Sequence, residues 1–209
     1  MRTHTKETQQ SLTPEMAITI LQEGNNRFIN NLKANRNLLQ QVNDTAAGQF
    51  PFAAILSCMD SRTSAELIFD QGLGDIFSIR VAGNVLNDDI LGSMEYACKV
   101  AGSKLVVVLG HTKCGAIIGA CNHVEVGHIT TLLEKVKPAM DQETQTTENR
   151  NGNNQEFVNH VTENNVHLTM ARVRKESPIL AEMEKNGEIR IIGGVYDVET
   201  GKVDFYLQD

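Results

Sequence analysis

Two short segments of the chain concentrate side chains that can bind a metal. Cys58, Asp60 and Arg62 lie within "CMDSR", and His111 and Cys114 lie within "HTKCGA". Two thiolates and one imidazole form a ligand set that suits zinc, and three protein ligands leave a fourth position for water, as in catalytic zinc sites. Each residue taken singly is more often structural, but the two segments together favour a metal site.

The elements before these segments explain how they can meet. "FAAILSC" (52–58) is an apolar run that ends at Cys58, and "KLVVVLGH" (104–111) is a second run, rich in Val and Leu, that ends at His111. Such runs are typical of strands covered on both faces of a parallel sheet. In parallel α/β sheets, binding sites gather at the carboxyl ends of the strands. If the two strands are neighbours, Cys58, His111 and Cys114 converge on one point.

Strands and helices alternate along the rest of the chain, which predicts an α/β fold with right-handed crossovers. We expect a central, mainly parallel β-sheet flanked by helices, with an N-terminal helical arm and a C-terminal strand pair. The chain is then a single domain, 1–209, in which 1–48 is the arm and 49–209 is the α/β core. After the first strand, the expected elements are a helix in 63–75, a strand over 76–84, a helix over 87–102, the strand over 104–111, a helix over 114–121, a polar loop over 141–155, a helix over 156–177, a helix capped by Ser177-Pro178, and a strand pair in 187–209 that turns at Glu199-Thr200-Gly201.

The N-terminal arm contains one predicted helix. Residues 1–12 are polar, and we expect a loose segment there. Thr13-Pro14-Glu15 is typical of a helix start, with a hydroxyl cap followed by proline at the first helical position. Apolar side chains then recur at roughly helical spacing as far as Leu32, and a polar stretch follows through Gly48. This helix can pack on a partner subunit or on its own core, and the pattern favours neither.

Composition narrows the class of protein and its partners. The chain has 209 residues, 41% of them hydrophobic, and a net charge of -7 at pH 7. The negative charge argues against nucleic acid or an anionic membrane as a partner. No apolar stretch approaches the length of a transmembrane helix, and the N-terminus lacks the hydrophobic segment of a secretory signal. We therefore expect a cytoplasmic location, and a leader removed before residue 1 stays open. Cys98 and Cys121 are interpreted as small buried hydrophobes.

The sequence resembles the β-class carbonic anhydrases from about residue 13 to the C-terminus. The resemblance rests on "CMDSR" at 58–62 and "HTKCGA" at 111–116, with "RVAGN" at 80–84 and "SMEYA" at 93–97 in support. It implies one zinc per subunit, held by Cys58, His111 and Cys114, and reversible hydration of carbon dioxide to bicarbonate and a proton. It also implies a homodimer or a homotetramer in which the N-terminal helix reaches across to its partner.

The resemblance also assigns roles to two neighbours of Cys58. Asp60 is expected to accept a hydrogen bond from the zinc-bound hydroxide, and Arg62 to clamp Asp60 in a bidentate ion pair that keeps the carboxylate charged. In some similar proteins the aspartate leaves the arginine and closes the zinc site. We predict the open arrangement here, with Asp60 paired to Arg62. Two thiolate ligands weaken the acidity of a zinc-bound water, so activity is expected to rise into mildly alkaline pH.

Six further residues match substrate-binding positions of similar proteins. Gln49 stands where plant-like members carry an active-site glutamine, although a solvated loop residue is the interpretation that the residue type alone favours. Phe77 and Tyr96 match an apolar pocket for carbon dioxide, and either is equally compatible with a place in the core. The last three are small: Ala82, in place of a larger aliphatic residue, and Gly83 and Gly115, which permit close approach of the backbone to a ligand.

Two other functions fit the same ligands. One is a zinc hydrolase that acts on another small electrophile. The other is a structural zinc module of a non-catalytic protein, in which a fourth protein ligand, such as Asp60, would close the metal site. A redox role for the cysteines is weaker, because no pair of them has the C-x-x-C spacing.

Overall fold

The protein is built on a five-stranded sheet with the strand order β2-β1-β3-β4-β5. This is a computed structural model, and it describes residues 3–207. The first four strands run parallel, and β5 pairs antiparallel with β4 at one edge. The expected mainly parallel sheet with a C-terminal strand pair is therefore confirmed. The strands are β1 (Ala53–Ser57), β2 (Ile76–Arg80), β3 (Leu105–His111), β4 (Arg190–Tyr196) and β5 (Val203–Tyr206).

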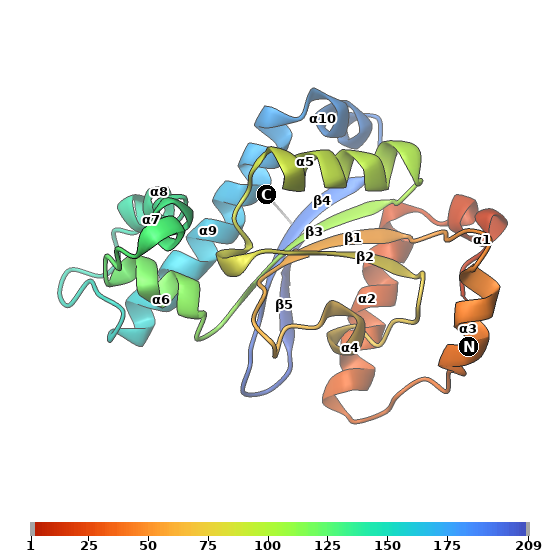
Figure 1. Ribbon diagram of the computed structural model, residues 1–209, viewed down its shortest axis with the longest axis horizontal. Helices are drawn as coiled ribbons and strands as arrows, with labels where there is room; N and C mark the ends of the chain where they lie inside the picture. The colour runs from red at the N-terminus through yellow and green to blue at the C-terminus, as the bar shows by residue number, and fades with distance from the viewer. Residues whose placement is uncertain (1–2, 208–209) are drawn as a thin grey trace.

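Helices cover both faces of the sheet (Figure 1). Helices α2 and α4 lie on one face, helices α5, α9 and α10 lie on the other, and α6, α7 and α8 group at the end of the sheet where β1 and β3 finish (Figure 1). The helices are α1 (Lys6–Ser11), α2 (Pro14–Ile29), α3 (Leu38–Thr45), α4 (Ala65–Ile68), α5 (Asp88–Glu95), α6 (Gly115–Cys121), α7 (Gly127–Glu134), α8 (Lys137–Gln142), α9 (Gln155–Glu176) and α10 (Pro178–Lys185).

Burial explains why the two central strands read as continuous apolar runs. Every residue of β1 and of β3 is buried, as expected for strands covered on both faces. The edge strand β2 is only partly buried. The expected strand over 76–84 ends earlier than predicted, at Arg80, because Ala82–Asn84 turns into a short 3-10 helix in which Gly83 has a φ of 68°.

The N-terminal helix packs on its own sheet. Thr13 caps α2 by accepting a hydrogen bond from the Met16 amide, as the sequence predicts. Ala17, Ile18 and Leu21 of this helix are buried in the cluster that covers β1 and β3. The helix therefore packs on its own core, and the expectation that it also reaches across to a partner subunit stays a prediction. The helix ends at Ile29, so the apolar spacing that continues to Leu32 overestimates its length.

Two short helices contradict the expectation for the flanking polar segments. Residues 6–11, expected to be loose, form α1, which Thr5 caps. Its Gln9 is buried and donates hydrogen bonds to the carbonyls of Pro51 and Ala101. The polar stretch before Gly48 contains α3, which Asn37 caps. Hydrogen bonds between polar side chains and distant parts of the chain hold these two helices in place. Because apolar packing contributes less, their sequences show little apolar periodicity.

The other differences are changes of boundary and two further helices. The expected helix in 63–75 is reduced to α4, and the one over 87–102 divides into α5 and a single π-helical turn, η2 (Tyr96–Val100). The polar run before α9 is a loop, as expected, whereas α7 and α8 were not anticipated. Within residues 3–207, no helix combines the length and the apolar character that a membrane span requires.

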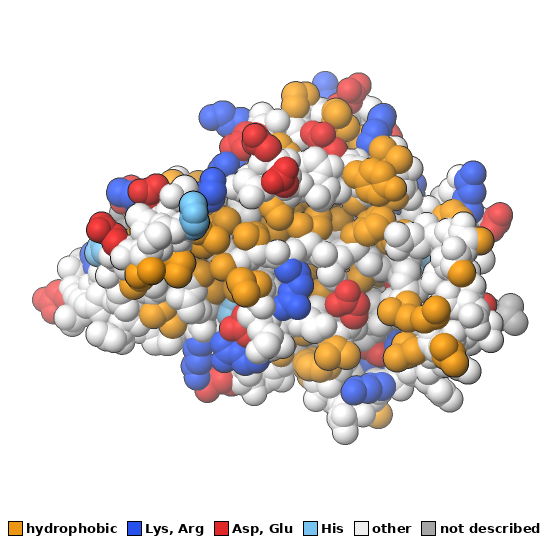
Figure 2. Space-filling view, in the orientation of Figure 1, with side chains coloured by type: hydrophobic (Ala, Val, Ile, Leu, Met, Phe, Trp, Pro, Cys, Tyr) orange, Lys and Arg blue, Asp and Glu red, His pale blue; other side chains and the backbone are white. Residues whose placement is uncertain are grey.

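One face of the molecule is rich in exposed hydrophobic side chains. Figure 2 shows them as a band across the face that carries β2 and α5. Large exposed hydrophobic residues on elements next to β2 and α5 are Leu67 of α4 and Tyr96 and Val100 of η2, which are 57–70% exposed. β2 is also an edge strand whose outer backbone groups have no partner strand within the described part of the chain.

Candidate metal centre

Three elements bring the predicted ligands together at one end of the sheet. Cys58 directly follows β1, His111 is the last residue of β3, and Cys114 is the cap residue of α6. Because β1 and β3 pair in parallel, with Ser57 opposite Leu109, the two strands end side by side. The ligand atoms of the three side chains all lie within 4.8 Å of one another, and all three residues are buried.

The imidazole of His111 is oriented for metal binding. Its Nδ1 lies 2.9 Å from the carbonyl oxygen of Thr112. A carbonyl only accepts hydrogen bonds, so Nδ1 carries the proton and Nε2 presents its lone pair. Nε2 is buried and has no hydrogen-bond partner. A buried nitrogen without a partner is costly in a folded protein, and a bound cation removes that cost.

The two sulfurs have the spacing that a tetrahedral zinc site requires. Cys114 Sγ lies 3.9 Å from Cys58 Sγ. Two sulfurs that are each about 2.3 Å from one zinc ion, at a tetrahedral angle, are about 3.8 Å apart. A hydrogen bond from the Cys114 thiol lowers the pKa of Cys58, and the same contact, together with burial, raises the pKa of Cys114. A bound cation would replace the shared proton. The residues present therefore fit zinc.

The described residues supply no fourth member to this ligand group. Asp60, the residue that would close a structural site, is instead paired with Arg62. Its Oδ1 accepts from the backbone N–H and the Nε of Arg62, both at 2.9 Å, and its Oδ2 accepts from Nη2 at 2.8 Å. These bonds hold the pKa of the Asp60 carboxyl well below its usual range. A carboxylate that stays charged at neutral pH therefore stands beside the ligand group.

Two residues, Arg80 and Thr63, fix the loop that carries Cys58 and Asp60. The sequence interpretation assigned no role to either of them. Arg80, at the end of β2, donates to the carbonyl of Cys58 at 3.1 Å and to that of Asp60 at 2.5 Å. The Thr63 hydroxyl lies 2.9 Å from each of the same two carbonyls. Arg80 opens the motif "RVAGN", so the motif itself was the available signal.

Two of the three small residues that were expected near the substrate lie at the edge of the metal centre. The Gly83 amide donates to Cys58 Sγ at 3.4 Å, and its φ of 68° together with a Cβ position 3.3 Å from Ala116 explains why glycine is required there. Gly115 begins α6 directly after Cys114, is exposed, and has open space where a Cβ would be. Ala82 precedes Gly83 in the same 3-10 turn.

Three comparisons with known proteins agree with this geometry. A family model described as carbonic anhydrase matches residues 53–203. Carbonic anhydrase 2 of Mycobacterium tuberculosis is 36% identical over 197 residues, which covers 90% of this chain and 91% of that protein. The β-carbonic anhydrase CafA of Aspergillus fumigatus superposes with a TM-score of 0.69, at 26% identity over 81% of each chain.

The chain belongs to the β-carbonic anhydrase family. It is therefore an enzyme of the carbonic anhydrase class. A Coccomyxa β-carbonic anhydrase solved with acetazolamide has the same fold, with a TM-score of 0.70 at 24% identity over 78% of this chain and 74% of that one. The relationship spans nearly the whole chain, so the resemblance first seen in the two ligand motifs is confirmed.

The other predicted substrate residues of this β-carbonic anhydrase lie elsewhere on the chain. The rings of Phe77 and Tyr96 meet edge to face, with centroids 6.4 Å apart, and line a surface hollow together with Asp88 and Asp89 of α5. No metal ligand lines that hollow. Gln49 is exposed, beside Gly74 in the loop before β2. A substrate role for these three residues stays a prediction.

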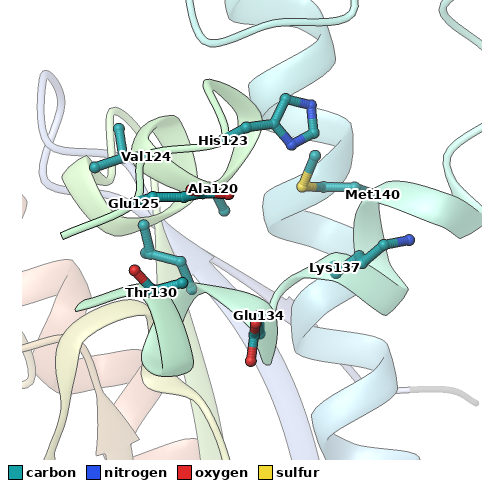
Figure 3. Close-up of a pocket in the computed structure, with 9 residues that line it drawn as sticks. Ala120, His123, Val124, Glu125, Thr130, Glu134, Lys137 and Met140 are labelled. Atoms are coloured by element: carbon teal, nitrogen blue, oxygen red, sulfur yellow. The ribbon is translucent and has the colours of Figure 1, made fainter. Parts of the chain in front are cut away.

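A second hollow, of about 120 Å³, lies between the end of α6 and helices α7 and α8 (Figure 3). Its lining combines Ala120, Leu133 and Met140 with charged residues such as Glu134 and Lys137. None of the three metal ligands contributes to it. The three candidate ligands themselves are buried.

Proposed function

We propose that the chain catalyses the reversible hydration of carbon dioxide to bicarbonate and a proton, with one zinc per subunit held by Cys58, His111 and Cys114. The observation that supports this most directly is the unpartnered, buried Nε2 of His111, which shares a small site with two cysteine sulfurs. When bound there, zinc would lower the pKa of a water molecule to about 7 and so supply hydroxide at neutral pH.

The residues around the ligands account for orientation of the reactants. Asp60 is held by Arg62 as a charged acceptor, so it can take a hydrogen bond from the attacking hydroxide and aim its lone pair at carbon. Arg62 supplies two parallel donors, which a lysine cannot reproduce. The Gly115 amide begins a helix beside Cys114 and is our candidate for holding an oxygen of bicarbonate.

The structural-zinc alternative requires a fourth protein ligand, and the described residues provide three. Substitution of Arg62 separates the two functions. An enzyme whose Asp60 depends on Arg62 should lose turnover by roughly 100-fold or more in Arg62→Ala, with zinc content unchanged. A purely structural site would keep its zinc, and the protein would show no hydration activity to lose.

The decisive measurement is zinc content together with the rate of carbon dioxide hydration. Stopped flow with a pH indicator should show hydration by the parent, which should hold about one zinc per chain. Cys114→Ser should lose both zinc and activity, whereas the control Cys98→Ser, outside the ligand group, should keep both. Hydrolysis of small esters without hydration of carbon dioxide would favour the hydrolase alternative.

We also propose that the enzyme is a homodimer or a homotetramer in the cytoplasm. The band of exposed hydrophobic residues beside the open edge of β2 supports association of subunits (Figure 2). Structures described as tetrameric β-carbonic anhydrases from Sordaria macrospora share the fold at 24% identity, with a TM-score of 0.68 over 78% of this chain and 84% of that one. All four cysteines are free thiols, in keeping with a reducing compartment. Light scattering after size-exclusion chromatography measures the mass, and a monomer would contradict the proposal.

A further inference from the structure

The loop that carries two of the three ligands is tied to the turn between β4 and β5. Thr112 lies between His111 and Cys114 in sequence. Its hydroxyl oxygen accepts a hydrogen bond from the Val198 amide at 3.0 Å and lies 3.3 Å from Oδ1 of Asp197, to which it donates. Its amide donates to the carbonyl of Tyr196 at 2.9 Å. Three hydrogen bonds therefore fix this one residue to the C-terminal strand pair.

The turn that receives these bonds is itself well braced. Asp197 accepts from the Glu199 amide at 2.9 Å and from the Thr200 hydroxyl at 2.7 Å. Asn25, buried on α2, donates to the carbonyl of Gly201 at 2.9 Å and accepts from the Val203 amide at 2.9 Å. The turn is thus anchored to the helix layer on one face of the sheet, which makes it a rigid support.

The Thr112 carbonyl is the group through which this support reaches the metal centre. That carbonyl accepts from Nδ1 of His111 at 2.9 Å and so determines which nitrogen carries the proton. The next residue, Lys113, has a φ of 53°, which turns the chain sharply enough to bring Cys114 back towards Cys58. If Thr112 shifts, the acceptor for Nδ1 and the start of this turn shift together.

We propose that Thr112 is a positioning residue of the zinc site. The β4–β5 turn holds Thr112 through its hydroxyl, and this keeps Nε2 of His111 facing the two cysteine sulfurs. The inference rests on the proposed zinc site. It assigns a function to Asp197 and Val198, which lie more than 80 positions from Thr112 in the chain. An ordinary surface threonine would affect neither the tautomer nor the geometry of the ligands.

Metal binding tests this proposal independently of hydration activity. Thr112→Val keeps the shape of the side chain and removes the hydroxyl. We expect its affinity for zinc, measured by competition with a chromophoric chelator, to fall by up to the roughly 10- to 100-fold that is typical when a partner of a metal-bound histidine is lost, because the carbonyl partner of His111 remains but is no longer held in place. The visible absorption of the cobalt(II)-loaded protein should change as well, because it reports the geometry around the metal.

Two matched variants make the result specific. Thr112→Ser restores a hydroxyl at the same atom and should recover most of the affinity and the parent spectrum. Thr200→Val removes a hydroxyl that braces Asp197 but does not itself contact Thr112, and it should weaken metal binding much less than Thr112→Val does. Should Thr112→Val fail to fold, judged by circular dichroism, Thr112→Ala removes the same hydroxyl with a smaller side chain.

The proposal is wrong if the Thr112 variant that folds binds zinc and cobalt like the parent. It is equally wrong if Thr200→Val weakens binding as much, since the effect would then belong to the turn in general. A parent that binds zinc tightly but does not hydrate carbon dioxide would contradict the proposed function and leave the positioning role of Thr112 intact. The two proposals can therefore fail separately.

Discussion

Hydrogen bonds around the metal ligands decide which atoms carry protons. The Thr112 carbonyl holds the proton of His111 on Nδ1, and Arg62 keeps Asp60 charged. The sequence indicated the ligands and the Asp–Arg pair because residue type and spacing carry that information. The motif "RVAGN" drew attention to Arg80, but it did not indicate that Arg80 holds the carbonyls of Cys58 and Asp60, because that contact spans two strands.

The pH dependence of activity follows from these charges. A group whose pKa is lowered by folding, such as Asp60, stays ionised as pH falls until it reaches the folded pKa. Its pairing stabilises the fold above an ordinary aspartate pKa of about 3.9, and that contribution is lost as pH falls from there through the folded pKa. Activity between pH 6 and 9 should therefore follow the metal-activated water and rise into the alkaline range. A flat stopped-flow profile over that range would contradict this expectation.

The geometry of Arg62 can be tested by a conservative change. Arg62→Lys keeps the positive charge but loses the planar pair of donors that reach both oxygens of Asp60. We expect kcat to fall by roughly 10-fold or more while zinc content stays that of the parent. Surface Arg172→Lys, which alters an exposed pair with Glu176 on α9, is the matched control and should leave kcat unchanged. Equal activity of Arg62→Lys and the parent would show that charge alone suffices.

Contacts between elements place α2 against the sheet. Gly24 of α2 approaches the end of α4 so closely that a Cβ would lie 1.8 Å from the carbonyl oxygen of Phe69. Two buried or partly buried side chains, Asn25 and Arg27, add hydrogen bonds to Ile68 and Asp70. A single helix–helix crossing therefore fixes the N-terminal region to the segment that follows the Cys58 loop.

That crossing predicts opposite effects for two glycine substitutions. Gly24→Ala forces α2 away from the backbone at Phe69, and we expect it to lower the free energy of unfolding by about 2–4 kcal/mol. Gly92 in α5 has no atom within 4 Å of the position that an added methyl group would take, so Gly92→Ala should be neutral or stabilise by up to about 1 kcal/mol. Urea denaturation of both variants measures the difference, and equal stabilities would contradict this packing of α2 on α4.

At the scale of the whole molecule, the metal centre joins parts that are distant in sequence. Its ligands come from the ends of β1 and β3 and from the start of α6, and all three are buried where these elements meet. A ligand that binds only the folded state stabilises it by mass action. Zinc should therefore stabilise the entire fold and not only the loop that holds it.

Removal of zinc should lower the stability of the protein measurably. With free zinc about 1,000-fold above its dissociation constant, the loss on chelation is about 4 kcal/mol, and added zinc should restore it. Cys114→Ser should show little response to the chelator, while Cys121→Ala, whose sulfur is outside the ligand group, should respond like the parent. Thermal unfolding with and without chelator provides the measurement. An unchanged parent would contradict a metal site coupled to folding.

Residue types and spacing along the chain predicted the central strands, the order of the main elements and the group of Cys58, His111 and Cys114, because burial on both faces and ligand spacing leave a pattern in the sequence. Three features appear only in the fold: α2 packs on its own sheet, the polar helices α1 and α3 form, and Phe77 and Tyr96 line a hollow apart from the candidate metal ligands. These outcomes depend on which surfaces and hydrogen-bonding groups meet in space. Periodicity along one chain reports the face that is buried, but not the partner that covers it.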